Sequence, residues 1–180
     1  PPAAASIIHP HIQVIIDNEP TNYLRISLTK SKDYYSKYLS NFWDDYLVSE
    51  LSLGERFIFE GEFFSWVASY APLANYEVIG IAQVNKSDIT KITEDEIMSI
   101  AKDILSMIKR MQERLELSSL NFSFFSGPIN DEERYYRIHI RIIGRPNVEP
   151  FYVNDRGFME ILHLEPVISV IPEELAEKLR

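Results

Sequence analysis

Two histidines flank a proline near the start of the chain, in the segment "SIIHPHIQVII" (residues 6–16). The segment is rich in β-branched and apolar residues, so we expect a strand. Because side chains alternate along a strand, His9, His11 and Gln13 would share one face. A neutral imidazole can attack a phosphorus atom and form a covalent phospho-histidine, which splits a difficult transfer into two steps. The spacing therefore indicates phosphoryl-transfer chemistry, with Gln13 able to bond the phosphate oxygens without adding repulsive charge.

A second interpretation of the same segment is that His9 and His11 are partly buried polar residues that alternate by chance. Two histidines together with Gln13, and with Ser6 just upstream, favour function over that alternative. Pro10 has no backbone N–H, so it frees that edge of the strand from pairing.

The segment "AAASIIHPHIQ" closely resembles the active-site segment of galactose-1-phosphate uridylyltransferases, whose pattern is Ser-x-x-His-Pro-His-x-Gln. These enzymes are the nucleotidyltransferase branch of the histidine-triad (HIT) superfamily. Residues 56–97 resemble the family's second domain in strand order and in the closing helix with a Thr-x-x-Glu start. "GFME" (157–160) and the terminal "PEELAEKLR" also fall in family order, so the likeness covers the whole chain.

The resemblance implies a transfer of UMP between a UDP-sugar and a hexose 1-phosphate. In that case His11 is the nucleophile that carries the uridylyl group, and Gln13 and Ser6 hold its phosphate. Phe158 and Glu160 stand where the family contacts the hexose, commonly across a dimer interface. We therefore expect nucleotide-sugar and sugar-phosphate substrates and a homodimer.

The resemblance also implies metal chemistry. His9 stands where the family often places a zinc ligand, and its cysteine partners would come from outside this chain, which contains no cysteine. A second metal site of the family uses histidines at the positions of Phe125 and Arg141, so only His139 remains. We expect the second metal to be absent.

The segment "YYRIHIRIIG" (135–144) places Arg137, His139 and Arg141 on one face of an expected strand. Two interpretations stay open, namely a solvated or structurally paired face and an anion-binding face that would make Arg141 a substrate-binding residue. The lone His163 is expected to be structural.

One stretch departs from the family pattern. Residues 161–169 read "ILHLEPVIS" where the family tends to have a Gly-rich stretch after its hexose-binding glutamate. A dinucleotide phosphorylase or hydrolase of the same superfamily is therefore an alternative, and so is a nucleotide-binding module without catalysis.

Composition limits the classes of partner. The net charge of -9 and a pI near 5.0 argue against nucleic acid and anionic membranes, since both attract basic surfaces. No apolar run is long enough to cross a bilayer, and we expect a cytoplasmic protein. The first residue is Pro1, and strand-like sequence follows almost at once, so we expect that a preceding portion of the protein is missing.

Periodicity predicts an α+β domain on a HIT-like antiparallel sheet with flanking helices. We expect residues 1–22 to end a preceding HIT-like half with its last strand, and residues 23–180 to form the C-terminal HIT-like domain. An aromatic stripe predicts one helix from about Ser31 to Glu50, with its aromatic side chains in the core. The other expected elements are strands in 56–69 around a turn at 60–62, in 76–84, 120–128 and 134–144, a helix capped by Thr93 and Glu96, and a closing helix at 172–180.

Overall fold

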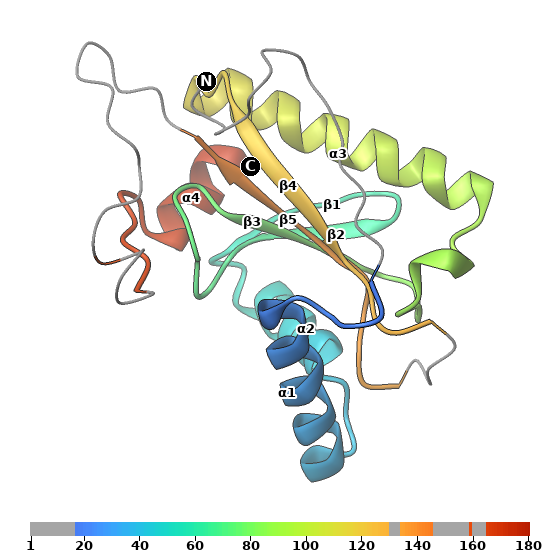
Figure 1. Ribbon diagram of the computed structural model, residues 1–180. Coiled ribbons are helices and arrows are strands. Elements are labelled where there is room, and N and C mark those ends of the chain that lie inside the picture. Colours follow the sequence, from blue (N-terminus) through green and yellow to red (C-terminus); the bar gives the residue numbers. More distant parts are fainter. Residues whose placement is uncertain (1–16, 130–133, 146–158, 160–164) are drawn as a thin grey trace.

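The computed structural model describes residues 17–129, 134–145, 159 and 165–180. Its centre is a five-stranded antiparallel sheet with the order β1-β2-β3-β5-β4 (Figure 1). The strands are β1 (Phe57–Glu60), β2 (Phe64–Ala68), β3 (Val78–Ala82), β4 (Leu120–Phe125) and β5 (His139–Gly144). The helices are α1 (Asn22–Tyr38), α2 (Phe42–Leu53), α3 (Glu94–Leu115) and α4 (Pro172–Leu179), with a 3-10 turn at Ile89–Lys91. The predicted α+β class with flanking helices is confirmed.

Helices cover both faces of the sheet. On one face α3 and α4 pack against alternate strand residues, among them Trp66, Ile140 and Ile142, none of which is exposed to solvent. On the opposite face α1 and α2 pack against a second buried cluster that includes Val67, Ile79 and Ile81 (Figure 1). Strand side chains alternate between the two layers, which is why nearly every residue of β2, β3 and β5 is buried.

The prediction of one helix from Ser31 to Glu50 is wrong, because two helices occupy this region. Leu39 ends α1 in the left-handed conformation, with φ 54°, and Asn41 starts α2 by accepting a hydrogen bond from the backbone N–H of Trp43 at 2.9 Å. An asparagine that caps a helix start is a strong boundary signal. The aromatic stripe continues across this break, and it therefore resembled one longer helix.

The aromatic stripe is also less buried than we expected. Tyr35 and Tyr46 pack against the core. Tyr38, Leu39 and Phe42 remain 54%, 81% and 39% exposed. The stripe crosses a corner between two helices, so only part of it reaches the sheet.

Helix α3 begins as predicted, with a capping box between Thr93 and Glu96. Near its start Ile97 is 54% exposed, whereas Asp103 more than one turn further on is buried. The Asp103 carboxylate accepts three backbone hydrogen bonds at 2.8 Å, from Glu62, Phe63 and Phe64. These bonds hold α3 against the β1–β2 turn. Position 61 in this turn must be glycine, because a Cβ atom there would lie 2.4 Å from the Asp103 carboxylate.

Strand β5 begins at His139, later than the predicted start at 134. The segment before it holds Tyr135 and Tyr136 in the cluster under α1 and α2. In the part of the chain that the structure describes, no helix is long and apolar enough to cross a membrane.

Candidate functional site

Most of the predicted site lies outside the described residues. This holds for Ser6, His9, His11, Gln13, Phe158 and Glu160, and for His163. Their roles stay predictions. Of the predicted site residues, the structure describes Arg141.

Arg141 lies on β5, on the sheet face that α1 and α2 cover, and its side chain is 13% exposed. Its Nη1 donates a hydrogen bond to Oε1 of Glu77, and the two side chains form a close ion pair. The guanidinium also lies 5.0 Å from the ring centroid of Tyr23, which is on α1. The structure thus places Arg141 in a paired environment, and contact between Arg141 and a substrate stays a prediction.

Glu77 is the partner that sequence reasoning missed. Its side chain is 1% exposed, and its Oε2 accepts a hydrogen bond from the backbone N–H of Leu73 at 2.6 Å. A carboxylate is almost never fully buried unless it is paired. The sequence carries a signal for this pair, because Glu77 is the acidic residue directly before the apolar β3, but it does not show which cation faces it.

His139 is fully buried between two aromatic rings. Its ring lies 4.0 Å from that of Trp43 and 5.0 Å from that of Phe125, both in stacked arrangements. Nδ1 is 3.1 Å from the carbonyl oxygen of Arg137, and a carbonyl only accepts, so Nδ1 carries the hydrogen. Nε2 has no hydrogen-bond partner among the residues that the structure describes.

Burial lowers the pKa of His139 to about 3, and the positive charge of Arg141 acts in the same direction. The bond from Nδ1 to the Arg137 carbonyl opposes this shift but does not overcome it. The imidazole is therefore neutral at physiological pH, and its burial keeps it away from solvent. His139 is a packed core residue and not an exposed acid or base.

Arg137 precedes β5 and is also paired. Its Nη2 lies 2.6 Å from Oδ2 of Asp44, on α2. The predicted shared face of Arg137, His139 and Arg141 thus packs under the two N-terminal helices. Of the two interpretations, the structure supports structural pairing for Arg137.

The donor set around His139 does not fit a metal. Phe125 has no atom that could bind a metal, and the guanidinium of Arg141 offers only N–H donors and a positive charge that repels a cation. Across the described ranges, no group of three histidine, aspartate or glutamate residues could hold a metal ion. The predicted zinc ligand His9 lies outside these ranges, so a zinc site there stays a prediction.

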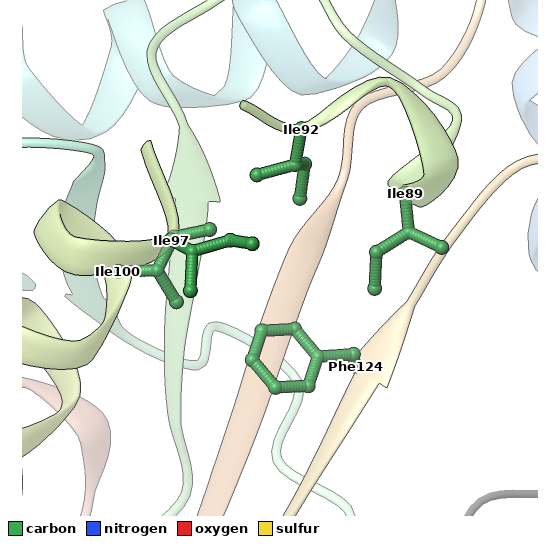
Figure 2. Close-up of a pocket in the computed structure, with 5 residues that line it drawn as sticks. All are labelled: Ile89, Ile92, Ile97, Ile100 and Phe124. Carbon is green, nitrogen blue, oxygen red and sulfur yellow. The ribbon is translucent and has the colours of Figure 1, made fainter. Parts of the chain in front are cut away.

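A shallow apolar pocket lies at the other side of the sheet. It has a volume of about 260 Å³, and its lining side chains point toward one another from the 3-10 turn, α3 and β4 (Figure 2). The lining residues are Ile89, Ile92, Ile97, Ile100 and Phe124. None of these five side chains is titratable or nucleophilic, so the described lining provides apolar contacts and no catalytic group.

Comparisons with known proteins support the resemblance. No protein-family model matches the sequence. A protein of Archaeoglobus fulgidus described as uncharacterized is 28% identical over 180 residues, which cover 99% of this chain and 52% of that protein. The galactose-1-phosphate uridylyltransferase of Neurospora crassa is 24% identical over 187 residues, which cover 96% of this chain and 45% of the enzyme. The chain thus spans about half the length of the curated relatives it matches.

Solved structures share the fold. A uridylyltransferase mutant superposes with a TM-score of 0.75 at 18% identity, over 87% of this chain and 51% of that one. An ADP-glucose phosphorylase from Arabidopsis thaliana with bound ADP-glucose gives a TM-score of 0.71 at 17% identity, over 87% and 48%. A galt-like protein from the same plant gives 0.74 at 17% identity, over 90% and 51%. The resemblance to the galactose-1-phosphate uridylyltransferase family is therefore confirmed in sequence and in fold.

Proposed function

We propose that this chain is part of a nucleotidyltransferase that moves a uridylyl group between a UDP-sugar and a hexose 1-phosphate through a covalent intermediate on His11. The observation that carries the proposal is the Ser-x-x-His-Pro-His-x-Gln pattern of residues 6–13, in a chain whose described part has the uridylyltransferase fold. A histidine nucleophile divides the transfer into two displacement steps.

In the first step His11 attacks the α-phosphorus of the nucleotide sugar. A phosphorus–nitrogen bond forms while the bond to the bridging oxygen breaks, and the sugar 1-phosphate leaves. In the second step a phosphate oxygen of the other hexose 1-phosphate attacks the same phosphorus, and His11 is released. Gln13 and Ser6 donate hydrogen bonds to the non-bridging oxygens, which stabilises the negative charge on these oxygens in the transition state without adding a repulsive charge.

The remaining roles in the proposal follow from the resemblance. Phe158 and Glu160 contact the hexose, and His9 is a zinc ligand whose partners lie outside this chain. Residues 1–22 belong to a preceding HIT-like half, and residues 23–180 form the second. The protein works as a homodimer in the cytoplasm.

A phosphorylase is the second candidate. In this version inorganic phosphate replaces the hexose 1-phosphate as the acceptor, and His11 keeps its role. Two observations favour it, namely the departure from the family pattern at residues 161–169 and the fold shared with an ADP-glucose phosphorylase. In this version the base of the nucleotide-sugar substrate is either uracil or adenine.

A product assay on the full-length protein separates the two candidates. UDP-glucose and ADP-glucose are each supplied with galactose 1-phosphate or with inorganic phosphate. Transfer of UMP to the sugar phosphate supports the uridylyltransferase, and release of a nucleoside diphosphate with phosphate supports the phosphorylase. Binding of the nucleotide sugars without turnover of any pair would contradict both.

Two matched variants test the division of labour between the histidines. His11→Asn should abolish transfer at a nearly unchanged melting temperature, because only a bond made during the reaction is lost. His9→Asn should lower the melting temperature or the zinc content and have a smaller effect on rate, since a structural zinc contributes folding free energy. Equal losses of activity at unchanged stability would contradict this assignment.

A further inference from the structure

Five side chains from four segments meet where α1 crosses the sheet. Tyr23 comes from α1, Glu77 directly precedes β3, Phe125 ends β4, and His139 and Arg141 come from β5. Phe125 and His139 are directly opposite each other in the β4–β5 register. We refer to these five residues as the Arg141 centre.

Ring contacts link the centre to α1. The rings of Tyr23 and Phe125 meet edge to face at 5.4 Å, and Phe125 stacks on His139 at 5.0 Å. On its other side His139 stacks on Trp43 of α2 at 4.0 Å. Edge-to-face and offset stacks of this kind add stabilisation beyond the area they bury. The aromatic contacts therefore run from α1 through the sheet edge to α2.

The guanidinium of Arg141 is the cation of the Arg141 centre. It pairs with the buried Glu77 and lies under the Tyr23 ring, 5.0 Å from its centroid. Its charge also reaches both neighbouring rings, since it lowers the pKa of His139 and opposes the rise that burial causes in the pKa of Tyr23. A cation held over an aromatic face in a desolvated place is strongly attracted to it.

We propose that the guanidinium of Arg141, neutralised by Glu77, is the fixed internal cation that holds α1 on the sheet, so that this junction does not depend on a metal. The resemblance implies a family metal site with histidines at the positions of Phe125 and Arg141, and in this chain a phenyl ring and a guanidinium stand there. The inference concerns the described residues alone and does not rest on the proposed function.

Removal of Arg141 gives the first test. Arg141→Met leaves Glu77 buried without its cation, which should lower the folding equilibrium constant by on the order of 10²–10³-fold. The double variant Glu77→Gln/Arg141→Met should recover part of this loss, because no buried charge is then uncompensated. Lys102→Met is the matched control, since its ion pair with Glu62 at 3.0 Å is exposed on both sides and should change the constant little.

Amide hydrogen exchange tests whether the effect is local to α1. In Arg141→Met, exchange should accelerate in α1 more than in α3, which packs on the opposite face. In addition, Tyr23→Leu should accelerate exchange in α1 of the wild type more than in the Arg141→Met background, because the two side chains act together. Equal acceleration in α1 and α3, or a Lys102→Met loss as large as that of Arg141→Met, would overturn the proposal.

Metal binding provides the second test. The measurements use the His9→Asn background, which removes the separately proposed zinc ligand. In this background, cobalt(II) should give no absorption band of a histidine-bound ion, and EDTA should leave the melting temperature unchanged. Addition of Phe125→His and Arg141→His would place three imidazoles on one face of the paired strands β4 and β5, and cobalt(II) should then bind with a new band. A cobalt(II) band that is present in the His9→Asn protein and lost with His139→Phe would overturn the proposal.

Discussion

Different interactions stabilise the two faces of the sheet. On the α3 and α4 face, the contacts with the strands are mainly apolar, with Trp66, Met107 and Ile140 fully buried, and Asp103 adds hydrogen bonds to the β1–β2 turn. On the α1 and α2 face, the sheet contributes Glu77, His139 and Arg141 among its apolar residues, and each has specific partners. The stability of the first face depends mainly on the packed volume of apolar side chains, and that of the second also depends on the partners of buried polar side chains. We therefore expect the two faces to respond differently to mutation and to pH.

The difference shows where change is tolerated. An apolar layer accepts other hydrophobic residues of similar size with modest loss. A buried pair such as Glu77 and Arg141 tolerates no single replacement without leaving a charge uncompensated. The α1 and α2 face is therefore the less tolerant of single substitutions.

The largest expected effect is on the apolar face. Trp66→Ala should lower the free energy of unfolding by about 3–5 kcal/mol, because the cavity of a fully buried tryptophan cannot be refilled by its neighbours. Urea unfolding checks this, with Val48→Ala on the exposed side of α2 as the control that should change little. A loss below that of the control would show that this layer does not depend on packed volume.

The next effect is a pH dependence on the opposite face. His139 has a folded pKa of about 3, below its unfolded value, so the unfolded chain binds more protons as the pH falls below about 6.5. The stabilisation from neutral His139 is complete above that pH and is lost as the pH falls toward 3. Between pH 7 and pH 5 the wild type should lose about 2 kcal/mol relative to His139→Phe. Parallel pH profiles for the two proteins would contradict the buried, neutral state of His139.

The smallest effect lies at the start of α3. Thr93→Ala removes the side chain that accepts from the Glu96 backbone N–H at 3.3 Å and should cost about 1 kcal/mol. Thermal unfolding checks the size, and Thr29→Ala in the exposed part of α1 is a control without a capping role. A larger loss than that of Trp66→Ala would reverse the order of importance that the two layers predict.

Much of the fold could be predicted from the sequence because the relevant signals are local. The strands in 56–69 and 76–84, the capping box at Thr93 and the closing helix at Pro172 are all confirmed. The break between α1 and α2 was missed because the aromatic stripe continues across it, although Ser40-Asn41 is a helix-start signal. Ion pairs such as Glu77 with Arg141 join residues that are distant along the chain, and no local pattern reveals them.

The catalytic residues were predicted from their spacing and from the family likeness, and the motifs that carry these predictions lie in residues 6–13 and 157–160. Neither source requires the tertiary structure. The partners of Arg137 and His139, which are Asp44 and Trp43 on α2, could not be predicted from the sequence. Alternation along a strand gives the face on which a side chain lies but not the residue that it contacts on a neighbouring element.

The central claim is a covalent intermediate on His11, and peptide mapping of the trapped enzyme tests it most directly. The full-length protein is mixed with UDP-glucose labelled in the uridine, without an acceptor, and the labelled peptides are separated under mildly basic conditions. We predict an acid-labile uridylyl group on His11, released when galactose 1-phosphate or phosphate is added and absent from His11→Asn. Turnover without a labelled peptide, or a label that persists in His11→Asn, would contradict the account.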